Sequence, residues 1–197
     1  MNKQKTSKRV RVQKKRDFEP QHLLVQVAEV ALEDAQKKIP GWKNQELVAI
    51  TFSALALEAL ANSFGNKLVS RWNDFESSSP IAKLRIICSE LGISPDWSRG
   101  HWHTALWLVK FRNKIAHAKP QPVHYDEIIS AEKFQKTFHE MPPSDLEAQV
   151  NLANAQRAVN AVVEIKWSFL AKMKRLRPME HSSLYSDGFS GITTKDS

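Results

Sequence analysis

Apolar side chains recur at helical spacing along most of the chain. Between residues 20 and 38 they form one stripe, and Pro40-Gly41 would end that helix. A second helix is predicted from Asn44 to Trp72. Its middle, residues 47 to 57, is apolar nearly all round, which is typical of a central, buried helix.

Further helices are predicted downstream. Ser79 and Pro80 have the chemistry of an N-cap and a first helical position, so a helix should follow over residues 81 to 91. We expect others at residues 101 to 117 and 130 to 138, and a long last helix that follows capping-box spacing at residues 144 to 147 and ends near Lys174. No segment alternates convincingly as a strand. The pattern predicts an all-α bundle of about four to five long helices with flexible termini.

Charge divides the chain into three parts. The formal net charge is +8, and residues 1 to 16 hold eight of the 29 basic residues and no acid, so the other 21 balance the 21 acids. We therefore expect a basic, disordered arm at residues 1–17, a helical domain at 18–177 and a disordered tail at 178–197. The arm would either aid solubility or attract phosphates without regard to sequence.

The single cysteine and the apolar segments indicate the cellular compartment of the protein. Cys88 is the single cysteine, so no disulfide framework is expected, and its apolar neighbours predict a buried, small hydrophobic side chain. No apolar stretch follows the basic N-terminus as in a secretory signal. The longest apolar run, residues 47 to 61, is interrupted by Thr51, Ser53 and Glu58. We expect a soluble, cytoplasmic protein with no membrane partner.

Several common sites have no matching motif. The chain has no Gly-rich phosphate loop, no Cys-x-x-Cys and no His-Glu-x-x-His. His101 and His103 are two residues apart, which on a helix turns them in different directions, so no metal site is expected. The six tryptophans are expected to anchor helices in the core rather than to stack on bases.

The end of the helix at residues 101 to 117 is different. Apolar residues lead into Arg112-Asn113-Lys114-Ile115-Ala116-His117. This arrangement resembles the HEPN family, in which an Arg and a His four to six residues later lie near the end of one helix, often with Asn directly after the Arg. The resemblance also includes residues 57–62, 83–84 and 90–93 and extends over about residues 20 to 175. The pairs Arg16/His22 and Arg175/His181 have similar spacing, but neither ends a hydrophobic helix.

The resemblance implies a metal-independent endoribonuclease of toxin or defence type that needs no cofactor. His117 would act as general acid and base, Arg112 would stabilise the transition state and Asn113 would position them. Flanking RNA phosphates could bind the lysines of this region: Lys110, Lys114 and Lys119. Positions five apart on a helix are rotated by about 140°, so a compact site needs either a wrapped Arg112 side chain or a second copy. The resemblance implies the second, a homodimer, and an antitoxin or other protein is a further expected partner.

Other interpretations stay open. Glu58 could lie at a solvent-facing edge of its helix, or it could orient Arg112 or Asn113 from behind. Arg112, Asn113 and His117 could cap the helix and stabilise a dimer. The chain would then be a catalytically silent HEPN-like dimer that binds a protein or nucleic acid. A third interpretation is a helical protein that binds nucleic acid through its tail alone.

Overall fold

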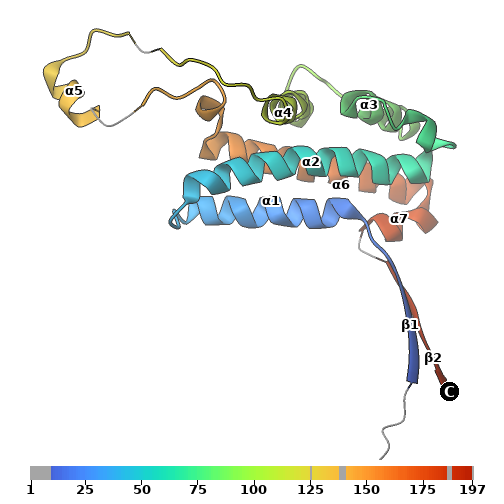
Figure 1. Ribbon diagram of the computed structural model, residues 1–197. Coiled ribbons are helices and arrows are strands. Elements are labelled where there is room, and N and C mark those ends of the chain that lie inside the picture. Colours follow the sequence, from blue (N-terminus) through green and yellow to red (C-terminus); the bar gives the residue numbers. More distant parts are fainter. Residues whose placement is uncertain (1–9, 125, 138–140, 186–187, 197) are drawn as a thin grey trace, which may run out of the picture.

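The computed structural model describes residues 10–124, 126–137, 141–185 and 188–196, and most of these residues are helical (Figure 1). The helices are α1 (Pro20–Gln36), α2 (Trp42–Leu68), α3 (Pro80–Glu90), α4 (Gly100–Ala116), α5 (Ala131–Thr137), α6 (Leu152–Leu176) and α7 (Pro178–Tyr185). Two short 3-10 turns join them, η1 (Trp72–Phe75) and η2 (Glu147–Gln149). Within the described residues, five helices have eleven residues or more. The predicted all-α class is therefore confirmed.

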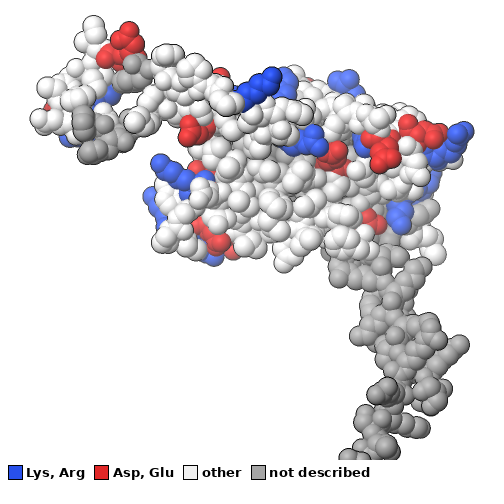
Figure 2. Space-filling model, viewed as in Figure 1, with Lys and Arg blue, Asp and Glu red and all other residues white. Residues whose placement is uncertain are grey.

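Helix α2 is the centre of the bundle. It contacts α1, α3, α4 and α6, and the side chains of Leu57, Leu60 and Phe64 are fully buried. The Phe64 ring packs edge-on against Phe169 of α6, with centroids 5.2 Å apart. By length and composition α2 is apolar enough to cross a membrane, but a core helix of a bundle has the same properties. In Figure 2 the charged side chains of the helical body lie mainly around the edges of the visible face.

Both N-terminal helices end earlier than the pattern predicts. Helix α1 ends at Gln36 rather than Lys38, and α2 ends at Leu68 rather than Trp72. Residue Arg71 has a left-handed backbone (φ 56°), which turns the chain so that the Trp72 ring lies against Gly65 of α2. Packing of Trp72 back onto the helix therefore replaces one further helical turn.

Local capping chemistry follows the sequence closely. The Ser79 hydroxyl accepts a hydrogen bond from the Ala82 N–H at 3.2 Å, and Pro80 is the first residue of α3, as predicted. The capping box also forms, since Glu147 accepts from the Ser144 N–H at 2.7 Å and donates its own N–H to the Ser144 hydroxyl at 3.2 Å. It opens η2 rather than the long helix, which begins at Leu152 after its own cap, Asn151.

At both ends of the chain, where we expect disordered segments, the structure describes two strands and a short helix. Strand β1 (Val10–Asp17) pairs antiparallel with β2 (Gly188–Asp196), and the two leave the body together beside the start of α1 (Figure 1). Residues 178 to 185 form α7, which packs on α6 and buries Leu184. The helical body brings the two ends of the chain together, so their backbones can pair although neither segment has a strand pattern of its own. Residues 1–9 of the arm lie outside the described residues.

Candidate functional site

Helix α4 carries the motif residues at its C-terminal end. Leu108 and Phe111 are buried and anchor the helix in the core, which fixes the position of the polar residues that follow. His117 is the C-cap residue, and its backbone N–H donates to the carbonyl groups of Asn113 and Ile115. Its side chain is exposed. The apolar half of α4 thus places Arg112 and His117 where the helix leaves the core.

Arg112 is held on the α2 side of α4. Its Nη2 donates to Oε2 of Glu58 at 3.2 Å, and its Nη1 donates to Oδ1 of Asn113 at 3.0 Å. The side chains of Arg112 and Glu58 are 38% and 30% exposed, so water screens the ion pair only in part. Glu58 therefore contacts Arg112, as one of the two interpretations of this residue expected.

A second polar contact lies one helical turn further along α2. Asn62 is four residues after Glu58, and its Oδ1 accepts a hydrogen bond from Nζ of Lys83 at 3.0 Å. Lys83 is only 3% exposed, which is unusual for a lysine. Lys83 lies in one of the segments that resemble the HEPN family but is not among the predicted site residues, although it occupies the apolar stripe of its helix, where Ile87 follows four residues later. The sequence signal that could have identified Lys83 is a lysine at a helix position where the pattern calls for an apolar residue.

Glu58 and Asn62 also line a groove of about 600 Å³ between α2 and the start of α1. Ser63, Asn66 and Lys67 of α2 continue its polar side. Apolar atoms come from both helices and from the segment before α1, including Phe18, Leu24 and Leu55. The two residues therefore connect a solvent-accessible groove on one side with two cations, Arg112 and Lys83, on the other.

The structure does not bring Arg112 and His117 together within one chain. Among the described residues no hydrogen bond joins their side chains, which agrees with a rotation of about 140° between positions five apart on a helix. Lys110, Lys114 and Lys119 are exposed, as is Asn113. Lys114 lies 4.0 Å from Asp145 of the segment before α6. His117 and these lysines form an exposed, basic helix end, while Arg112 faces α2.

Another groove lies elsewhere, between the start of α4 and α6. It has a volume of about 780 Å³, and its lining includes His101, His103 and Arg157. Arg157 is engaged with the Trp107 ring, 4.6 Å from its centroid. In the part of the chain that the structure describes, no group of three or more His, Cys, Asp or Glu side chains could hold a metal ion. Neither histidine is connected to the motif at the other end of α4.

No family model, curated protein or solved structure matches this chain.

Proposed function

We propose that the protein is a metal-independent endoribonuclease of toxin or defence type, acting in the cytoplasm with Arg112 and His117 as its chemical groups. The observation that carries the proposal is the end of α4, where an exposed imidazole and an arginine held by two hydrogen bonds lie among exposed lysines. Imidazole transfers protons near neutral pH, and a guanidinium stays charged and matches the geometry of a phosphate. These are the groups that RNA cleavage without a metal requires.

The reaction would use the substrate's own nucleophile. Neutral His117 would take the proton of a 2′-hydroxyl while the 2′-oxygen attacks the adjacent phosphorus. The bond between phosphorus and the 5′-oxygen breaks, and that oxygen leaves with a proton from a protonated His117. Arg112 would stabilise the additional negative charge on the phosphoryl oxygens. The products are a 2′,3′-cyclic phosphate and a 5′-hydroxyl, so DNA would bind without being cut.

A homodimer would complete this site. Arg112 faces α2 whereas His117 lies on the exposed end of α4, so one copy does not bring the two side chains together. Two copies that meet at these ends would place the Arg112 of each near the His117 of the other. Glu58 and Asn113 would then act as positioning residues, because they hold the guanidinium through Nη2 and Nη1.

The test is cleavage of mixed RNA by the purified full chain in excess EDTA. His117→Ala should lower the rate by on the order of 10²- to 10⁴-fold, and Arg112→Ala by a comparable factor. The matched controls are His124→Ala and Arg175→Ala. His124 is an exposed histidine outside the motif, and Arg175 is an exposed arginine that is followed at similar spacing by His181. Cleavage that survives both motif substitutions would place the chemistry elsewhere, and a strictly monomeric mass by light scattering at high concentration would contradict the shared site.

One observation favours a second candidate, a catalytically silent dimer that binds a protein or nucleic-acid partner. Arg112 already has a carboxylate and an amide as partners within its own chain, which is also how a purely structural arginine is satisfied. In that case the wild type would not cleave RNA in EDTA, and Arg112→Ala would weaken dimerisation or stability instead.

A further inference from the structure

The groove beside α2 has a polar wall whose hydrogen-bonding atoms can be assigned. Glu58 uses Oε2 for Arg112, and among the described residues its Oε1 has no hydrogen-bond partner. Oδ1 of Asn62 faces Lys83, and since an ammonium can only donate, the amide oxygen must be the atom directed to it. The Nδ2 donor of Asn62 is therefore left for other partners. Along one turn of α2, the groove offers a carboxylate acceptor and an amide donor.

An acceptor beside a donor matches one kind of nucleobase edge. Cytosine and adenine each carry an exocyclic amino group next to a ring nitrogen that accepts a hydrogen bond, whereas uracil presents a carbonyl next to a ring N–H. Carboxylates accept from the cytosine amino group, and asparagine amides pair with adenine. Side chains four apart on a helix have Cβ atoms about 5 to 6 Å from each other, so both can reach one planar base.

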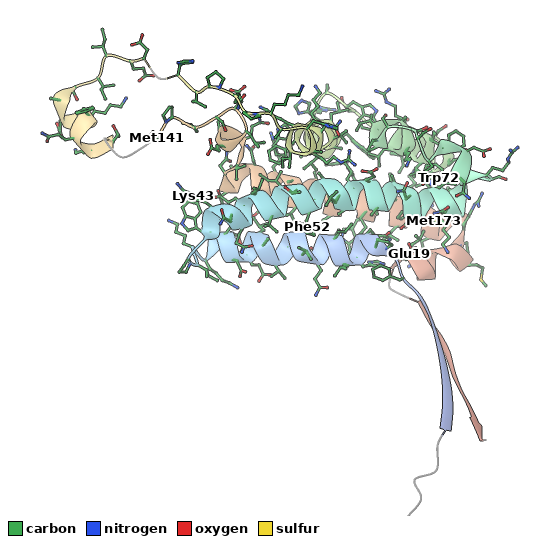
Figure 3. The ribbon with its side chains drawn as sticks, in the orientation of Figure 1. Glu19, Lys43, Phe52, Trp72, Met141 and Met173 are labelled. Carbon is green, nitrogen blue, oxygen red and sulfur yellow. The ribbon has the colours of Figure 1, made fainter. Side chains whose placement is uncertain are left out.

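The surroundings of this wall suit a nucleotide. Arg112, which is bonded to Glu58, has a side chain that is 38% exposed, so a phosphate that follows the base along the strand could meet its positive charge. Lys83 is buried behind Asn62 and fixes the orientation of that amide. Phe18 lies at the groove with its side chain about half exposed, and Leu24 and Leu55 supply apolar surface for the faces of a ring. Figure 3 places Glu19, next to Phe18, at the start of α1, and Glu19 also lines the groove.

We propose that this groove binds a cytosine or adenine base of an RNA strand and thereby gives the protein a base preference. The inference rests on the proposed function, since the strand would pass Arg112 next to the bound base. Glu58 Oε1 would accept from the exocyclic amino group, Asn62 Nδ2 would donate to the ring nitrogen, and Asn66 would contact the rest of the nucleotide from the next turn of α2.

The experiment compares how tightly the full chain binds two fluorescein-labelled hexamers, one of 2′-O-methylcytidine and one of 2′-O-methyluridine. Fluorescence polarisation measures the binding. These bases have nearly the same size and differ in the edge that the groove would recognise, and the 2′-O-methyl group blocks cleavage. The cytidine hexamer should bind roughly tenfold more tightly, the discrimination typical of one good base contact. Ala59→Phe fills the groove and should abolish this preference, while Ala153→Phe, the same change in the larger groove, should keep it.

Asn66→Ala is a second test. The Asn66 side chain is exposed, so we expect this variant to fold as the wild type does. It should weaken binding of the cytidine hexamer, and Asn44→Ala, an exposed asparagine at the other end of α2, should leave it unchanged. Equal binding of the two hexamers, or a preference that survives Ala59→Phe, would overturn the proposal. Cytidine monophosphate competing as well as the hexamer would overturn the assignment to an RNA strand. Cleavage in EDTA is measured separately, so loss of the base preference and loss of the nuclease activity are distinguishable.

Discussion

At the scale of single residues, burial decides how each functional group behaves. Arg112 and Glu58 are about one-third exposed, so they can pair with each other and still meet a ligand. Cys88 is only 2% exposed, as the sequence predicts, and desolvation raises the pKa of its thiol to about 12. Burial therefore makes the single cysteine an inert packing group rather than a nucleophile.

Cys88 should be almost unreactive toward alkylating reagents while the protein is folded. At pH 8 the native protein should react with iodoacetamide on the order of a thousandfold more slowly than the protein in guanidinium chloride, because only the thiolate reacts and a pKa near 12 leaves very little of it. Since the folded pKa is raised, stability should also fall as pH rises above the ordinary thiol pKa. Mass spectrometry over time checks the reaction, and equal rates in both states would show that Cys88 is accessible.

At the scale of elements, helix ends are set by short-range chemistry. Ser79 and Pro80 begin α3 as their sequence predicts, and the exposed Ser144–Glu147 box forms with both of its hydrogen bonds. The pKa of Glu147 is held below its ordinary value chiefly by the hydrogen bonds to Ser144. The box begins only a short turn, because the chain becomes extended at Val150 before α6 starts.

Ser79→Ala should destabilise the protein by about 1 kcal/mol, the usual effect of removing a serine N-cap. The Ala82 N–H would lose its acceptor, and the first turn of α3, which carries Lys83, would loosen. Urea unfolding followed by circular dichroism measures this change. Ser77→Ala, in the preceding loop and likewise exposed, is the control and should stay within experimental error of the wild type.

At the scale of the whole molecule, the excess positive charge and the helical core lie in different parts of the chain. The basic excess lies at residues 1–16, whereas the helical core is built from α1, α2, α3, α4 and α6. Strand β1 pairs with β2 outside that core, so the helices do not depend on it for burial. The arm can therefore be removed to ask what its charge contributes.

Deleting residues 1 to 16 should weaken binding of single-stranded RNA and reduce the slope of log K against log salt by up to about 5 or 6, because as many as eight charges are lost. The helical circular dichroism signal should persist. Binding titrations between 50 and 200 mM salt give the slope. An unchanged slope would mean that the arm aids solubility only, and the preference for cytidine over uridine should be unaffected in either case.

Features that depend on neighbours along the chain can be predicted from the sequence. Helical spacing of apolar residues places α4 and its polar end, the Ser79 side chain begins α3, and the apolar neighbours of Cys88 predict its burial, because each follows from contacts within a few residues. Contacts between residues on different helices, in contrast, depend on how the helices pack. The rotation of each helix about its axis and its packing on α2 bring Arg112 to Glu58, 54 positions away, and Lys83 to Asn62, 21 positions away. The same packing brings the two chain ends together as β1 and β2, since a pairing across the whole chain has no local pattern to reveal it.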